Sequence, residues 1–307
     1  MKKIILALIG YLSVNIVFNY RVYWHQLITD LSKTGAVWGE VQSYEWLTDK
    51  FYRTIMAGQN PFGLVQGILY PFNFHLGLTD AANGFYFLFL KPFFSIHQSM
   101  SIIAALSLLL ANIGMYLLLR TLKFDKLISF FVGLVYGYMT FLMPRGGHLN
   151  YWSIYLFPWF YYCLINLLQS NKKWVNIISS FGVSFFFVLT LWLNFYYFVM
   201  LLISLFCLFL YYLSFKSKLF FEHVKRLWPY GILTFLLMVI FLIPWAKGLY
   251  EATIFDEIPK ISGWGGAIEF GSDLFNYFIP SGYGYYVSKF PFLYKPFLLF
   301  LKLFRPE

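Results

Sequence analysis

A succession of uninterrupted apolar runs constrains the fold of this chain more than any other feature of its sequence. Several runs approach or exceed the roughly 20 residues that a helix needs to cross about 30 Å of hydrocarbon. A membrane barrel would instead show short segments of alternating apolar and polar residues. Charged residues make up only 12% of the 307 residues, about half the share in a soluble domain. The sequence therefore predicts an all-α, polytopic transmembrane bundle of about 7–8 spans.

The expected spans leave two long segments between them. Seven apolar runs cover residues 4–18, 100–119, 127–143, 151–168, 175–193, 195–215 and 228–245, and a weaker run at 290–304 would supply an eighth. The long segments cover residues 20–97 and 247–289. We treat residues 1–307 as a single transmembrane domain with these two segments as its long loops.

The distribution of Lys and Arg predicts the orientation of the chain. Nine of these residues fall in the three short loops that follow the second, fourth and sixth runs, whereas the two short turns on the other side hold Arg145 alone. Because basic residues stay on the cytoplasmic side, we expect a cytoplasmic N-terminus, both long loops outside, and a multi-pass protein of the plasma membrane. A cleaved signal peptide is the alternative for the first run, but no small-residue cleavage site follows it.

The first outer loop concentrates the carboxylates that the rest of the chain almost lacks. Glu40, Glu45 and Asp49 fall within ten residues, although the whole chain has only 13 acidic residues. Between residues 42 and 56, apolar side chains recur at helical spacing and predict one amphipathic helix lying in the membrane interface. A second interfacial segment is expected over residues 80–90.

Glu40 is the candidate general base. It follows Gly39, which lets the backbone turn tightly before the predicted helix. A carboxylate near an apolar interface is partly desolvated, which raises its pKa toward the working pH. The alternative is a solvated loop glutamate. Glu45, Asp49 and Arg53 share one helix face, where the alternative to a functional role is a solvated face of mutually paired charges.

Arg145 and His148 lie in the turn between the third and fourth runs. Arg145 opposes the topological bias, and its guanidinium suits bidentate contact with a phosphate. The alternative is a charge that merely extends to the membrane interface. His148 is a candidate base or substrate contact, or simply a turn residue.

The sequence predicts neither a cofactor nor a nucleic-acid partner. The two cysteines, Cys163 and Cys207, lie inside apolar runs and lack the spacing of metal ligands. We therefore expect no zinc and no haem, and a requirement for a divalent cation stays open. We attribute the net charge of +10 to the orientation of the chain in the membrane rather than to binding of nucleic acid. The basic residues gather in the short loops that we expect on the cytoplasmic side.

Several short motifs, taken in order, resemble the C-type (GT-C) membrane glycosyltransferases. In both, a first span precedes a long outer loop with an acidic residue after a glycine, an aromatic-rich helix, and then GxNPF and YP. The matching residues are Gly39-Glu40, Trp46, 58–62, Tyr70-Pro71, 133–138, Arg145, 147–150, Pro158, Asp273-Leu274 and Ile279-Pro280-Ser281. The similarity covers most of the chain.

This resemblance implies a concrete activity. Such enzymes take a sugar from a polyprenyl-phosphate carrier and transfer it, with inversion, to a lipid, glycan or protein acceptor outside the cytoplasm. An acidic residue of the first outer loop is their general base. Carried over to this sequence, Glu40 is that base, Arg145 contacts the carrier phosphate and His148 positions the substrate. Further candidates for substrate contact are Glu45, Asp49 and Asn150.

Two departures from the family pattern leave other hypotheses open. The family usually has Asp where this chain has Glu40, and a misplacement of about 1 Å can cost on the order of a hundredfold in rate. Members of that family also commonly have more spans and a further C-terminal region. A truncated member of the family and an inactive relative are therefore the alternatives to an intact enzyme. The competing function is non-enzymatic, as in a lipid or glycan transporter or scrambler. The predicted spans lack interior Asp, Glu, Lys and Arg, which argues against ion-coupled transport only.

Overall fold

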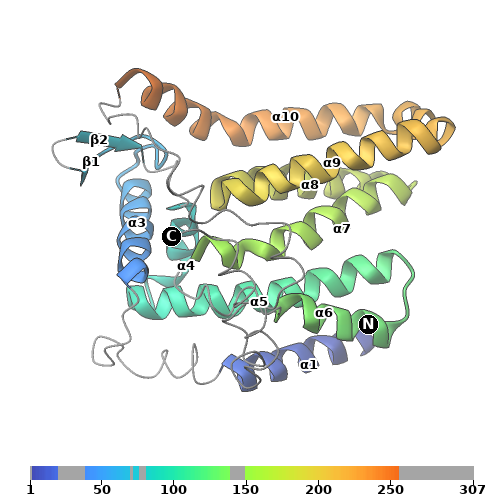
Figure 1. The fold of residues 1–307 in the computed structure, drawn as a ribbon, viewed down its shortest axis with the longest axis horizontal. Coiled ribbons are helices and arrows are strands. Elements are labelled where there is room, and N and C mark those ends of the chain that lie inside the picture. The colour runs from blue at the N-terminus through green and yellow to red at the C-terminus, as the bar shows by residue number, and fades with distance from the viewer. Residues whose placement is uncertain (1, 20–38, 70–71, 76–80, 139–148, 256–307) are drawn as a thin grey trace, which may run out of the picture. The chain divides into compact units, whose positions relative to one another are not determined.

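The computed structural model describes residues 2–19, 39–69, 72–75, 81–138 and 149–255. The chain divides into two compact units, Met1–Glu257 and Ile258–Glu307, and all described residues belong to the first. The helices are α1 (Lys2–Asn19), α3 (Gly39–Met56), α4 (Gly84–Leu90), α5 (Ile96–Thr121), α6 (Lys126–Gly137), α7 (Leu156–Gln169), α8 (Lys173–Leu193), α9 (Phe195–Phe215) and α10 (Ser217–Phe255) (Figure 1). Two 3-10 segments, Ala81–Asn83 and Leu149–Tyr155, and two strands, β1 (Leu64–Leu69) and β2 (Phe72–His75), complete the described elements.

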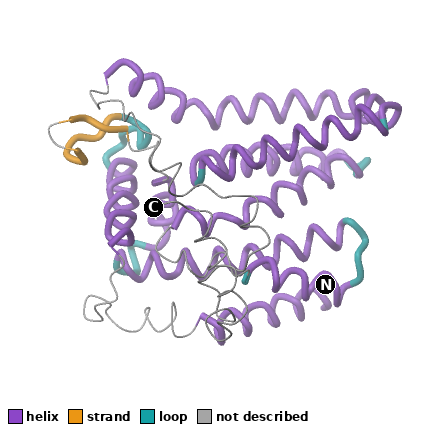
Figure 2. The backbone as a smooth tube through the Cα atoms, viewed as in Figure 1, coloured by secondary structure: helices purple, strands orange, loops and turns teal. Residues whose placement is uncertain are grey.

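The described residues are predominantly helical, which confirms the predicted class (Figure 2). The exception among them is the antiparallel ribbon of β1 and β2, in which Leu64 pairs with His75 and Leu69 with Phe72 across an irregular register. This ribbon lies in the expected first outer loop and was not predicted. The sequence LVQGIL of β1 does not alternate apolar and polar residues, so it carries no strand signal.

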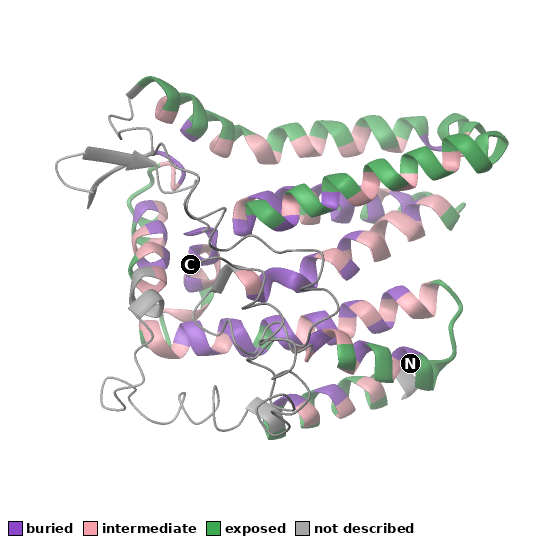
Figure 3. Ribbon diagram, in the orientation of Figure 1, coloured by how far each residue is buried: buried purple, intermediate pink, exposed green. Residues whose placement is uncertain are grey.

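Four of the described helices, α5, α8, α9 and α10, are long and apolar enough to cross a bilayer, and α1 and α6 are apolar but shorter. Large apolar side chains stay exposed along α9 and α10 (Figure 3), as with Phe206 at 60% and Phe235 at 64%. Apolar surface this extensive marks contact with an apolar environment rather than with water. The chain is a membrane-associated protein.

One predicted loop is wrong. Residues 216–226, expected to connect two spans, are helical from Ser217 onward, and α10 then continues to Phe255 despite two internal prolines. The second long loop therefore starts later than residue 247. Lys, Leu, Glu and Arg are good helix formers, and no glycine precedes Gly231, so nothing in this stretch ends the helix.

Two other predicted spans differ from the observed helices. The run at 127–143 is helical in α6 only as far as Gly137, and the end of that run lies outside the described residues. The run at 151–168 starts as a 3-10 segment, and the α-helix begins at Leu156 with Pro158 in its first turn, where no amide donor is needed. The runs at 4–18, 100–119, 175–193 and 195–215 correspond to α1, α5, α8 and α9. The expected run at 290–304 lies outside the described residues.

The two ends of the bundle differ in charge. The turns between α5 and α6, α7 and α8, and α9 and α10 lie at one end, which we call the basic end (Figure 1). The basic residues in and beside these turns are Arg120, Lys123, Lys126, Lys172, Lys173, Lys216, Lys218, Lys225 and Arg226. The opposite end holds α3, α4 and the β-ribbon, and we call it the α3 end.

Glycines allow the helices of the bundle to approach one another closely. A Cβ added to Gly137 of α6 would lie 1.7 Å from Asn112 Oδ1 of α5, and one added to Gly133 would lie 2.3 Å from the Tyr11 hydroxyl of α1. Gly133 and Gly137 are four residues apart, so they form one small-residue stripe on α6. The Tyr11 hydroxyl donates a hydrogen bond to the Phe130 carbonyl at 3.0 Å. This stripe joins α1, α5 and α6.

The same principle operates between the other helices. A Cβ on Gly114 of α5 would lie 2.8 Å from the Trp159 ring of α7, and one on Gly182 of α8 would lie 2.4 Å from Cys163 Sγ. The Ser184 hydroxyl of α8 lies 2.8 Å from the Thr234 carbonyl of α10, to which it donates. Close packing and hydrogen bonds to backbone carbonyls drive helix association where both sides are equally apolar.

Substituting Gly137 by Leu is expected to destabilise the bundle because the side chain has no room against Asn112. Overpacking typically costs about 1–3 kcal/mol and occasionally more. The matched control is Val135→Leu, which enlarges an exposed residue of the same helix. Thermal unfolding in detergent should show a lowered midpoint for the first variant and an unchanged one for the second. Equal midpoints would contradict the close approach of α5 and α6.

Candidate functional site

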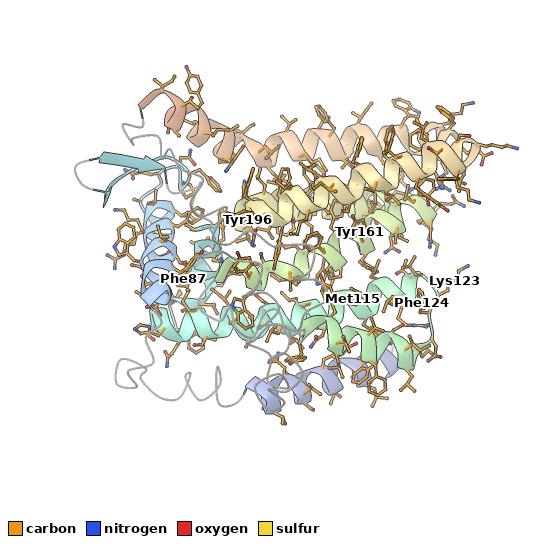
Figure 4. The ribbon with its side chains drawn as sticks, viewed as in Figure 1. Phe87, Met115, Lys123, Phe124, Tyr161 and Tyr196 are labelled. Atoms are coloured by element: carbon orange, nitrogen blue, oxygen red, sulfur yellow. The ribbon has the colours of Figure 1, made fainter. Side chains whose placement is uncertain are left out.

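Aromatic side chains fix α3 to the end of the bundle. Phe51 of α3 is fully buried, and its ring centroid lies 5.3 Å from that of Phe62 and 5.1 Å from that of Phe85. Trp192, near the end of α8, lies 5.1 Å from Phe62 and 5.5 Å from Phe85. We call these four rings the aromatic core. Phe87, also fully buried, lies beside α3 (Figure 4).

The predicted amphipathic helix is confirmed in its position along the chain and in its apolar stripe. Tyr44, Leu47 and Ile55 pack, partly buried, against the same cluster of buried residues as Phe51. The helix begins at Gly39 rather than near residue 42. Its apolar stripe therefore faces protein, because α3 packs against α4, α5 and the 3-10 segment before α4.

The segment after α3 ties it to α10. Gly58 ends the helix with a φ of +69°, a conformation that favours glycine. Asn60 then accepts a hydrogen bond from the Phe62 amide at 3.2 Å and donates one to the Pro244 carbonyl of α10 at 3.0 Å. A Cβ on Gly248 of α10 would lie 1.9 Å from the Phe62 carbonyl oxygen. The GQNPF motif thus has a structural role in this fold.

A carboxylate of α3 is held between two cations. Asp49 accepts a hydrogen bond from Arg53 Nε at 2.6 Å on one oxygen, and its other oxygen contacts the Lys91 ammonium. Its side chain is only 11% exposed, whereas that of Arg53 is 68% exposed. The less exposed of its two partners is Lys91, which follows α4 and whose side chain is 21% exposed. With both oxygens engaged by cations, Asp49 is suited to fixing α3 against α4.

Lys91 is held in place by two different interactions. Besides its contact with Asp49, its ammonium lies 4.7 Å from the centroid of the Tyr52 ring, a cation–π geometry. Burial lowers the pKa of Lys91, and the Asp49 carboxylate opposes this effect because it favours the charged form. We regard the pair as ionised.

The second carboxylate pairs with a histidine. Glu45 Oε1 lies 2.5 Å from His97 Nδ1 in the first turn of α5, and the Glu45 side chain is 12% exposed. The His97 side chain is 42% exposed. A carboxylate that orients a partly exposed imidazole is an arrangement able to hold or pass a proton. We call Glu45, Asp49, Arg53, Lys91 and His97 the α3 charge cluster.

The sequence left open that Glu45, Asp49 and Arg53 form a solvated helix face of mutually paired charges, and the observed charge cluster differs from that. The Asp49–Arg53 pair is confirmed, but Glu45 and Asp49 are largely buried and their other partners come from outside α3. Lys91 and His97 were missed, because neither stands in a recognisable motif. The available signal was that they are the only basic residues between positions 81 and 99.

The other predicted site residues fall at the limits of the described chain. Glu40 lies in the first turn of α3 rather than before the helix, and its side chain is not described. Asn150 lies in the 3-10 segment Leu149–Tyr155, likewise without a described side chain. Arg145 and His148 lie outside the described residues. In the described part, no group of three or more His, Cys, Asp and Glu side chains is placed to hold a metal ion.

The described flanks of the segment that carries Arg145 and His148 pack against the large buried cluster to which α3 also contributes. Tyr138, just after α6, and Tyr151 both pack against the cluster of buried residues that contains Phe51. Tyr155 is buried, and its hydroxyl hydrogen-bonds that of Tyr86 in α4. The segment therefore leaves and re-enters the described fold beside this cluster, which extends from α3 to the middle of α5.

Replacing Lys91 by Met is expected to destabilise the protein, because it leaves the largely buried Asp49 carboxylate without the less exposed of its two cationic partners. We expect a loss of about 1–3 kcal/mol in the free energy of unfolding, below the value for fully buried pairs. The matched control is Arg53→Met, which removes the exposed partner of the same carboxylate and should cost less than about 1 kcal/mol. Denaturant unfolding in detergent measures both. Equal losses of unfolding free energy in the two variants would contradict a larger contribution of Lys91 than of Arg53.

Comparisons with known proteins show which family the chain belongs to. No curated protein and no solved structure matches the chain. A family model described as a domain of unknown function, DUF6311, matches residues 7–296. Because this match extends over nearly the whole sequence, the chain belongs to the DUF6311 family.

Proposed function

We propose that the protein is an inverting membrane glycosyltransferase that moves a sugar from a polyprenyl-phosphate donor to a lipid, glycan or protein acceptor, with Glu40 as general base. One observation carries this proposal. The helix that bears Glu40 and both described flanks of the Arg145–His148 segment pack against one buried cluster, which extends from α3 to the middle of α5. In this proposal the Glu40 carboxylate and the Arg145 cation act together beside that cluster.

The proposed topology follows from the charge of the two ends. We propose a multi-pass protein of the plasma membrane, with about 7–8 spans and the basic end in the cytoplasm. The turns at that end carry the Lys and Arg residues, and α1 starts there with Lys2 and Lys3 (Figure 1). The α3 end would then face outward, where the lipid-linked donor is used.

The place of Glu40 in α3 supports its role. Residues 40, 44, 47 and 51 recur at helical spacing, so the Glu40 position lies in line with Tyr44, Leu47 and Phe51. Those three side chains pack against the buried cluster. The first turn of a helix also favours a negative charge, because of the helix dipole. A carboxylate there would be partly desolvated yet ionised, as a general base requires.

The proposed reaction is a single displacement. The Glu40 carboxylate takes the proton of an acceptor hydroxyl, whose oxygen attacks the anomeric carbon on the face opposite the phosphate. The bond between that carbon and the phosphate oxygen breaks, and polyprenyl phosphate leaves with the electron pair. Arg145 balances the charge of the leaving phosphate, and His148 and Asn150 hold the sugar.

The charge cluster has a supporting part in this proposal. Glu45 and Asp49 were candidates for substrate contact, but their carboxylates pair with His97 and Lys91. This pairing favours a positioning role, in which the cluster fixes the angle of α3 and with it the place of Glu40. An error of about 1 Å at a reacting group can cost on the order of a hundredfold in rate.

The test is sugar transfer in membrane vesicles supplied with a panel of polyprenyl-phosphate sugars. Glu40→Gln should lower transfer by about 10²–10⁴-fold, the usual effect of losing a general base, with unchanged amounts of folded protein. Glu40→Asp keeps the carboxylate and should retain measurable transfer. Glu222→Gln, an exposed change at the basic end, is the control and should be silent.

Full transfer by Glu40→Gln would remove this residue from the mechanism. No transfer from any donor, together with movement of labelled lipid across vesicles that lack an acceptor, would instead favour a passive lipid transporter. Within α5, α8 and α9, Asp, Glu, Lys and Arg occur only in the end turns, which argues against ion-coupled transport in either case.

A further inference from the structure

An apolar cavity of about 390 Å³ lies between α7, α9 and α10, near the basic end. This volume falls in the range of about 300–1,000 Å³ that is typical of small-molecule sites. The cavity is remote in sequence from every residue of the proposed glycosyltransferase site. Its lining residues are Leu164, Leu167, Leu168, Leu205, Leu208, Phe209, Tyr212, Phe220, His223, Val224, Leu227, Trp228 and Gly231.

The lining determines what the body of a ligand must be. Apart from the Tyr212 hydroxyl and the His223 imidazole, the lining side chains carry only apolar groups or, in Trp228, an indole. One helical turn from the lining, on the side away from the basic end, the hydroxyls of Tyr161 and Ser204 hydrogen-bond between α7 and α9 (Figure 4). An occupant therefore has an apolar body, and any charged part of it points toward the basic end.

The rim of the cavity at the basic end is cationic. Arg226 donates to Asn171 Oδ1 at 2.8 Å and to the Leu168 carbonyl, and its guanidinium lies 3.2 Å from His223 Nδ1. It thus contacts two of the lining residues directly. Lys216, Lys218 and Lys225 are exposed nearby in the α9–α10 turn and the first turns of α10. Exposed cations beside an apolar hollow are complementary to an amphipathic anion.

Gly231, one of the lining residues, leaves part of this space open. A Cβ at this position would meet nothing within 4 Å, although Gly231 lies inside α10. Other helical glycines lie tightly against a neighbour, including Gly10, Gly84, Gly114, Gly133, Gly137, Gly182 and Gly248. Glycine disfavours a helix interior, so its use here indicates room for a ligand rather than for a protein side chain.

We infer that this cavity binds an acyl chain of an anionic phospholipid, whose phosphate headgroup lies at the basic end, beside Arg226 and in the positive field of the exposed Lys216, Lys218 and Lys225. The apolar surface of α9 and α10 places the cavity at the depth of lipid chains, and the rim selects a negative headgroup. The bound lipid would join α7 to the α9–α10 pair at the basic end. This inference does not depend on the proposed transferase activity.

The acyl-chain part is tested by filling the cavity. Gly231→Leu starts its side chain from a Cβ that meets nothing within 4 Å, and Gly231→Ala is the matched control that leaves most of the space free. Lipid bound to the detergent-purified protein is quantified by mass spectrometry. We expect the wild type and Gly231→Ala to retain phosphatidylglycerol and Gly231→Leu to retain at least tenfold less. Equal retention by Gly231→Leu would overturn the inference.

A second filling variant guards against misfolding of the first. Leu208→Trp enlarges the lining from α9, and it should lose phosphatidylglycerol in the same way. Each variant is compared with the wild type by its thermal unfolding in detergent without added lipid, where equal midpoints show an intact fold. Retained lipid in a folded Leu208→Trp protein would also count against the cavity as the binding site.

The headgroup part is tested by titrating lipids into delipidated protein and following the unfolding midpoint. Phosphatidylglycerol should raise the midpoint of the wild type, phosphatidylcholine should raise it less, and inorganic phosphate should have no effect. The triple change Lys216→Gln, Lys218→Gln and Lys225→Gln should remove the preference for phosphatidylglycerol. Equal effects of the two lipids on the wild type, or a full effect of phosphate alone, would refute an anionic phospholipid as the occupant.

Discussion

Close approach at small residues is the interaction on which the rest of this structure depends. In an apolar solvent the hydrophobic effect does not distinguish a neighbouring helix from lipid, so association relies on contact and on hydrogen bonds. Here Gly137 meets Asn112, Gly114 meets Trp159, and Ser184 donates to the Thr234 carbonyl. These contacts fix which helices are neighbours. At the α3 end, α3 and α4 pack against α5 of this bundle.

The α3 end is assembled from parts that are distant in sequence. Phe62 lies between the aromatic rings of Phe51 and Trp192, and its carbonyl rests on Gly248 of α10. The GQNPF motif, which suggested a resemblance in the sequence, is thus explained here by packing and by its hydrogen bond to Pro244. Such a motif can recur in related folds for structural reasons alone, so its presence favours a shared architecture more strongly than a shared chemistry.

The sequence predicted α3 well because its apolar stripe and the Asp49–Arg53 pair are local, with partners within one or two helical turns. It did not predict Lys91 and His97 as partners of α3, because they are 42 and 52 residues away from Asp49 and Glu45 in the chain. The predicted start of the span at 228 was also too late, because the basic segment from Ser217 onward is compatible with a loop as well as with a helix. Tertiary contacts decide such cases, and a single sequence does not contain them.

The charge pairing narrows the choice of a base within α3. A general base must accept a proton, and a neighbouring cation opposes this because it stabilises the ionised carboxylate. Asp49 contacts two cations and Glu45 contacts His97, so each carboxylate already has a structural partner. Glu40, a further carboxylate of α3, occupies the first turn of the helix, where the helix dipole favours a negative charge. For the proposed transferase, this pairing therefore favours Glu40 over Glu45 and Asp49 as the general base.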